Sequence, residues 1–110
     1  MNISSLGEGP GRIVGYEGDG NILGLDVLTI QNLFKSSGLI LFRGFLMSEH
    51  IFPSFVGPFT SQFLRDEYGN SKMPDPAGGY VQGVTLGSKP IELHCENAVS
   101  AERPDIIWFY

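Results

Sequence analysis

The sequence predicts an α+β fold, and three observations support this prediction. Fifteen glycines and seven prolines in 110 residues require many turns, which favours short strands and irregular loops. Residues 26–37 instead have apolar side chains at helical spacing. Short apolar runs bounded by glycine, such as residues 39–42, are typical of buried strands. The predicted order is helix, strand, helix, loop, strand, strand, loop, strand.

Composition and charge are those of a globular protein and exclude some functions. The chain is 42% hydrophobic and 17% charged, neither disordered nor membrane-like. Its net charge of −5 argues against non-specific nucleic-acid binding, which needs a basic surface. The single cysteine excludes an internal disulfide and fits a reducing compartment. With no secretory signal at the N-terminus and no apolar run long enough for a bilayer, we expect a cytoplasmic protein without a membrane partner.

The chain changes character at residue 25. Residues 1–24 are rich in glycine, serine and acidic residues, so we expect a poorly structured arm with at most a short strand at residues 12–16. From there on a helix is predicted, with Asp26 as its N-cap and Gly38 just past its end. The helix would carry four apolar side chains on one face: Val27, Ile30, Leu33 and Phe34.

Residues 39–42 predict a strand buried on both faces or nearly so. Ser48 is a candidate cap for a second helix, although Pro53 disturbs a helix beyond its first turn, so the start of this helix stays open. Its apolar side would be formed by Phe52, Phe55, Val56 and Phe59.

The second half of the chain predicts a long loop and three strands. Residues 65–78 hold charges, prolines and glycines without periodicity, and a loop of this length favours a functional role. Strands are predicted at residues 79–86, 91–96 and 105–110, with the aromatic run 108–110 in the core. The acidic residues of the loop are interpreted as solvated charges: Asp66, Glu67 and Asp75.

The strand 91–96 carries the main candidate for chemistry. Side chains alternate along a strand, so Glu92, His94 and Glu96 share one face and Cys95 lies on the apolar face. His94 and Glu96 would lie roughly 7 Å apart at the backbone, within reach of one metal ion. An imidazole and a carboxylate form the first half of the two-histidine, one-carboxylate site of non-haem iron oxygenases. Without further context, ordinary polar residues on a surface strand would show the same pattern.

Three other residues that could take part in a site have simpler interpretations than metal or substrate binding. Glu92 would lie about 13 Å from Glu96 along the strand, so it is interpreted as a solvated or supporting group. Cys95 is interpreted as a small buried hydrophobe rather than a soft metal ligand. Arg43 is more often a structural ion-pair partner than a substrate contact.

Three segments occur in an order and spacing that is more specific than any one of them. Gly-Leu-Ile-Leu-Phe-Arg-Gly-Phe at residues 38–45 resembles a "G-v-v-v-F-R-G" strand between two helices. Residues 91–97 resemble an H-x-[D/E] metal-binding strand, and residues 103–110 resemble a "P-x-x-l-x-F-y" strand. Over residues 25–110 the chain thus resembles the N-terminal portion of TauD/TfdA-type dioxygenases, the taurine-dioxygenase-like Fe(II)/2-oxoglutarate oxygenases. It is most similar to the clavaminate-synthase-like and syringomycin-pathway hydroxylases, where glutamate follows the histidine.

The resemblance implies the N-terminal part of a double-stranded β-helix (jelly-roll) with flanking helices. It implies Fe(II), with 2-oxoglutarate and O2 as cosubstrates, and hydroxylation of a small molecule such as an amino-acid-derived or secondary metabolite. His94 and Glu96 match the first two iron ligands. Gln82 and Thr85 lie on the preceding strand, which lines the pocket in relatives, so Gln82 is a candidate substrate contact.

The resemblance also implies two residues for which these 110 residues offer no counterpart. One is a distal histidine, the third iron ligand; the other is an arginine that pairs with the 2-oxoglutarate carboxylate. His50 is the only other histidine and precedes the motif, so it is not assigned as a ligand. We therefore expect a completing C-terminal segment, and a chain that is inactive alone. The apolar strand at residues 106–110, where the sequence stops, favours the same expectation.

Two alternatives stay open. The chain could be a non-catalytic oxygenase remnant, or a binding module whose sheet a partner completes. It could also keep a metal but use other chemistry, as a zinc hydrolase or a cupin-like isomerase does. A non-haem halogenase is disfavoured, because relatives of that type replace the carboxylate with a small residue to admit chloride, and Glu96 fills that space.

Overall fold

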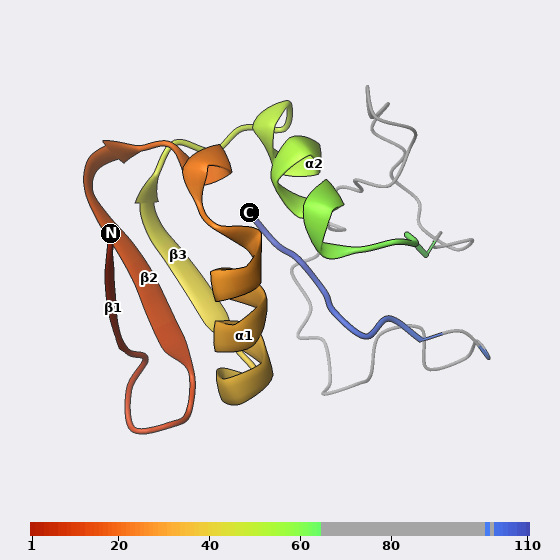
Figure 1. Ribbon diagram of the computed structural model, residues 1–110, viewed down its shortest axis with the longest axis horizontal. Coiled ribbons are helices and arrows are strands. Elements are labelled where there is room, and N and C mark those ends of the chain that lie inside the picture. The colour runs from red at the N-terminus through yellow and green to blue at the C-terminus, as the bar shows by residue number, and fades with distance from the viewer. Residues whose placement is uncertain (65–100, 102) are drawn as a thin grey trace, which may run out of the picture. The chain divides into compact units, whose positions relative to one another are not determined.

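The computed structural model describes residues 1–64, 101 and 103–110, shown in colour in Figure 1. They belong to two compact units, Met1–Phe59 and Thr60–Tyr110. The first unit is a small α+β fold, as predicted, with a three-stranded sheet and two α-helices. Its elements are β1 (Asn2–Ser5), β2 (Arg12–Gly20), the 3-10 helix η1 (Ile22–Gly24), α1 (Val27–Ser37), β3 (Ile40–Phe45), α2 (Ile51–Val56) and the 3-10 helix η2 (Gly57–Phe59).

The sheet is mixed, with the strand order β1-β2-β3. β1 pairs with β2 antiparallel, so that Ser5 lies opposite Arg12. β2 pairs with β3 parallel, so that Arg12 also lies opposite Ile40. Parallel strands need a crossover connection, and α1, which packs against β3, provides it. The centre of the unit is therefore a β2-α1-β3 arrangement, to which β1 adds as an edge strand (Figure 1).

The N-terminal segment corrects one prediction. Residues 1–24 were expected to form a poorly structured arm, but β1 and β2 lie within them. The short strand predicted at residues 12–16 is confirmed, and it extends to Gly20. All four residues of β1 are exposed, so β1 is held by backbone hydrogen bonds to β2 rather than by burial of apolar side chains. Hydrophobic periodicity therefore gives no sign of it.

Helix α1 confirms the predicted helix and both of its caps. Asp26 Oδ2 accepts hydrogen bonds from the backbone N of Thr29 at 2.8 Å and from Thr29 Oγ1 at 2.7 Å. At the other end, Gly38 adopts a left-handed conformation (φ 70°), and its N–H donates to the carbonyl of Phe34 at 2.7 Å. Of the predicted apolar face, Ile30 is buried, and Val27, Leu33 and Phe34 are half-buried.

The Asp26 cap predicts a pH-dependent stability. Hydrogen bonds from the Thr29 hydroxyl and then from the Thr29 N–H lower the pKa of Asp26 below its ordinary value of 3.8. Because the folded-state pKa is lowered, the ionised Asp26 carboxylate stabilises the folded state above pH 3.8. This stabilisation is lost as the pH falls through the lowered pKa. Thermal unfolding should show Asp26→Ala less stable than wild type at pH 7, and the difference should narrow at acidic pH.

Asp26→Asn is the matched control, because asparagine keeps a cap acceptor but cannot ionise. It should stay more stable than Asp26→Ala at every pH. A wild-type advantage over Asp26→Ala that is equal at pH 7 and pH 2 would show that the charge of Asp26 contributes nothing.

Strand β3 confirms the strand predicted at residues 39–42 but not its burial. Ile40, Leu41 and Phe42 are half-buried, and Leu39, just before the strand, is 56% exposed. In the part of the chain that the structure describes, β3 pairs with β2 alone. A strand at the edge of a sheet is covered less than a central one, which accounts for the partial exposure.

Helix α2 forms in spite of Pro53. The N-cap of α2 is His50, which makes no side-chain cap hydrogen bond. Ser48, the predicted cap, lies two residues earlier and still supports the first turn: its Oγ accepts from the N–H of Ile51 at 3.3 Å, and its carbonyl accepts from the N–H of Phe52 at 2.9 Å. Pro53 is the third residue of α2, within the first turn, where backbone N–H groups have no partner in the helix. The predicted apolar side is confirmed for the helix itself: Phe52, Phe55 and Val56 are buried.

A row of aromatic rings joins α2 to the sheet. The ring of Phe55 lies 5.2 Å from that of Phe42 on β3 and 5.3 Å from that of Phe59 on η2, both edge-on. Phe42 continues the row to Phe45 at 6.3 Å, and Phe45 to Tyr16 on β2 at 5.8 Å. These centroid distances fall in the favourable range for aromatic pairs.

In the second unit, the strand predicted at residues 105–110 is wrong. No strand is assigned in residues 103–110, because a strand is defined by hydrogen bonds to a neighbour and no described strand pairs with this segment. The expectation that its aromatic residues lie in the core is wrong for Phe109 and Tyr110, which are 74% and 63% exposed, whereas Trp108 is half-buried. The predicted loop 65–78 and the strands 79–86 and 91–96 lie outside the described residues.

No helix in the described ranges combines the length and the apolar character that a membrane span requires.

Candidate functional site

The first of the three motif segments, residues 38–45, is formed by the cap of α1 and strand β3. It lies between α1 and α2 along the chain. Within β3, Arg43 and Gly44 are the two residues without a large apolar side chain. The structure separates their roles.

Gly44 allows the backbones of β2 and β3 to come together. Its φ of 79° lies in the left-handed region, and a Cβ at this position would collide with the carbonyl oxygen of Tyr16. At this point the register shifts: Gly15 lies opposite Arg43, and Gly20 lies opposite Phe45. β2 thus bulges beside Gly44, and the glycine has a structural role here.

Arg43 lies in the ladder opposite Gly15, with an exposed side chain. Ion pairing was the expected role of Arg43, but no other residue of the described ranges forms an ion pair with it. Its guanidinium therefore contributes little to the fold as described, in contrast to the neighbouring glycine.

This contrast gives a prediction. Arg43→Ala should change the free energy of unfolding by no more than about 0.5 kcal/mol, as is usual for exposed positions. Chemical denaturation followed by far-UV circular dichroism measures it. A loss above about 1 kcal/mol would reveal an ionic partner for Arg43.

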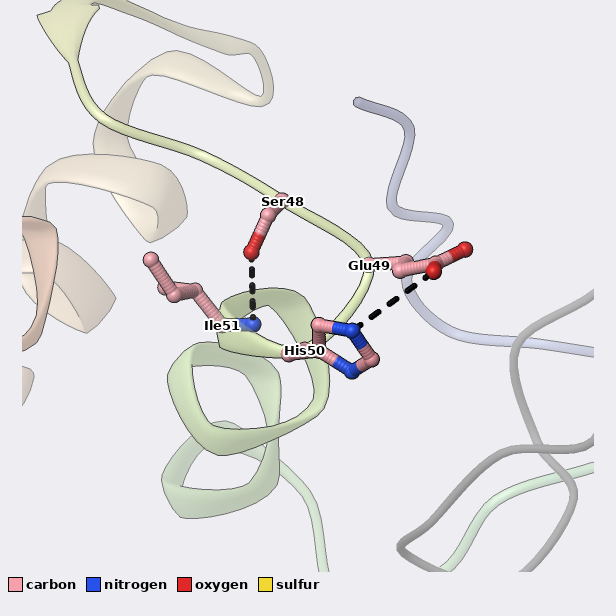
Figure 2. A network of polar contacts seen from close by, with 4 residues as sticks. All are labelled: Ser48, Glu49, His50 and Ile51. Atoms are coloured by element: carbon pink, nitrogen blue, oxygen red, sulfur yellow. Dashed lines mark hydrogen bonds and ion pairs between the residues drawn. The ribbon is translucent and has the colours of Figure 1, made fainter.

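His50, the one histidine in the described ranges, lies at the start of α2. Figure 2 shows its imidazole turned toward the Glu49 carboxylate, with Nε2 and Oε1 3.6 Å apart. Both side chains are solvent-exposed, 75% for His50 and 48% for Glu49, and such surface pairs contribute little. No group of three histidine, cysteine or acidic residues that could hold a metal occurs among the described residues.

A shallow apolar pocket, which the sequence did not predict, lies beside α2. It has a volume of ≈160 Å³ and is formed by η1, the start of α1 and the α2–η2 segment. Its lining includes Ile22, Leu25, Val27, Phe55, Pro58 and Phe59. No titratable side chain lines it, so it offers no acid–base chemistry. The apolar residues of η1 fall within the segment expected to be unstructured, which is why the pocket was missed.

The predicted iron ligands, His94 and Glu96, and the predicted substrate contact, Gln82, lie outside the described residues. Other residues discussed in the sequence analysis also lie outside the described residues: Asp66, Glu67, Asp75, Thr85, Glu92 and Cys95. Comparison with known protein families, with curated proteins and with solved structures finds no match to this chain.

Proposed function

We propose that this chain is the N-terminal, iron-binding portion of an Fe(II)/2-oxoglutarate-dependent dioxygenase that hydroxylates a small molecule. The observation that carries the proposal is the ordered set of three motif segments, residues 38–45, 91–97 and 103–110. The order α1, β3, α2 around the first segment agrees with the order that the resemblance implies, and it supports the proposal. The proposal assigns residues 25–110 to the N-terminal part of a double-stranded β-helix with flanking helices.

The donor chemistry of the second segment suits iron. His94 offers a neutral imidazole nitrogen and Glu96 a carboxylate oxygen, both suitable ligands for Fe(II). Two protein ligands, or three with a further histidine, leave coordination positions open for other groups. Bound iron would supply the oxidising chemistry, with 2-oxoglutarate and O2 as cosubstrates.

The other proposed roles concern binding and orientation. The amide of Gln82 can both donate and accept hydrogen bonds, which suits a polar small-molecule substrate. The proposal also requires a histidine as third ligand and an arginine for the 2-oxoglutarate carboxylate, and it assigns both to a segment outside residues 1–110.

Metal titration tests the proposed ligand. Under anaerobic conditions, Fe(II) should bind the wild-type chain, and His94→Ala should lower the affinity at least about tenfold because one of two ligands is lost. His50→Ala is the matched control: it removes the other histidine, which is exposed just before α2, and should leave the affinity unchanged. Isothermal calorimetry measures all three.

Two results would contradict this assignment. Equal affinities of wild type and His94→Ala would remove His94 from the site. A loss confined to His50→Ala would place the metal at the other histidine instead.

The coding sequence beyond codon 110 gives an independent test. The proposal expects a histidine followed by an arginine, in frame or across a frameshift. Without them, the dioxygenase would lack its third ligand and its cosubstrate anchor.

A second candidate is a binding module that a partner chain completes. The exposed apolar residues of the C-terminal segment favour it, since Ile107 is 47% and Phe109 is 74% exposed and clustered exposed apolar residues often mark contact surfaces. Sedimentation of the purified chain separates the two candidates. Self-association would favour the module, whereas a monomer with cooperative unfolding would count against it.

A further inference from the structure

We draw no further inference here: the strongest candidate, the shallow apolar pocket that η1, the start of α1 and the α2–η2 segment form around Leu25, Val27 and Phe55, is an apolar surface, and nothing in the described residues shows what covers it.

Discussion

Gly44→Ala should lower the free energy of unfolding of the first unit by about 3 kcal/mol or more, among the largest effects that one methyl group can have. Two costs combine at this position. A non-glycine residue is strained at a φ of 79°. The new Cβ would also meet the carbonyl oxygen of Tyr16 on β2, a backbone atom, so the two strands would have to shift to admit it.

Gly38→Ala separates these two costs. Gly38 also has a positive φ, 70°, but a Cβ there would meet no atom within 4 Å. Its substitution should therefore cost only the backbone strain, about 1–2 kcal/mol. Urea unfolding of the full chain, followed by far-UV circular dichroism, measures both variants. Equal losses of unfolding free energy at the two positions would show that the contact between the new Cβ at position 44 and the Tyr16 carbonyl costs nothing.

Phe55→Ala should cost about 3–5 kcal/mol, the usual range for truncating a buried phenylalanine. Phe55 is 4% exposed, and its ring lies edge-on to both Phe42 and Phe59. Truncation would leave a cavity beside the sheet and would interrupt the row of rings that joins α2 to β3. Far-UV circular dichroism is the suitable probe, because the one tryptophan, Trp108, belongs to the second unit.

Leu28→Ala is the control for this prediction. Leu28 is also a large apolar residue of the first unit, but it is 68% exposed, so its truncation should change stability by less than about 0.5 kcal/mol. If Phe55→Ala prevents folding, Phe55→Leu, which keeps most of the volume, should still fold with a loss below about 1.5 kcal/mol. A loss below about 1 kcal/mol for Phe55→Ala would contradict the packing of α2 on the sheet.

The parts of the fold that could be predicted from the sequence are those with local signals. Asp26 and Gly38 mark the two ends of α1 through hydrogen bonds to residues one turn away, and the spacing of its apolar residues defines the buried face. Ser48 likewise accepts a hydrogen bond from Ile51, the first residue of α2, although His50 is the N-cap. Each of these signals depends on a few residues that are close in the sequence, so it can be recognised from the sequence alone.

The parts that could not be predicted depend on distant partners. β1 is exposed along its whole length and forms only because β2 offers it hydrogen bonds. The bulge beside Gly44 depends on the register between β2 and β3, to which no short motif corresponds. The segment 105–110 has the composition of a strand but no described strand to pair with. For the candidate site, the sequence predicts the ligand types at His94 and Glu96, but their geometry would come from pairings of the same non-local kind.

The crossover through α1 also determines how this unit can fold. β1 meets β2 around one turn, and α1 is a single helix, so both can form quickly from local contacts. β2 and β3 pair only after the whole segment with η1 and α1 has been closed between Arg12 and Ile40, and closing such a loop costs entropy before any contact compensates. The docking of β3 is therefore the step that we expect to limit the folding rate. Gly44, which lies beside the register shift between the two strands, belongs to the contacts that this step forms.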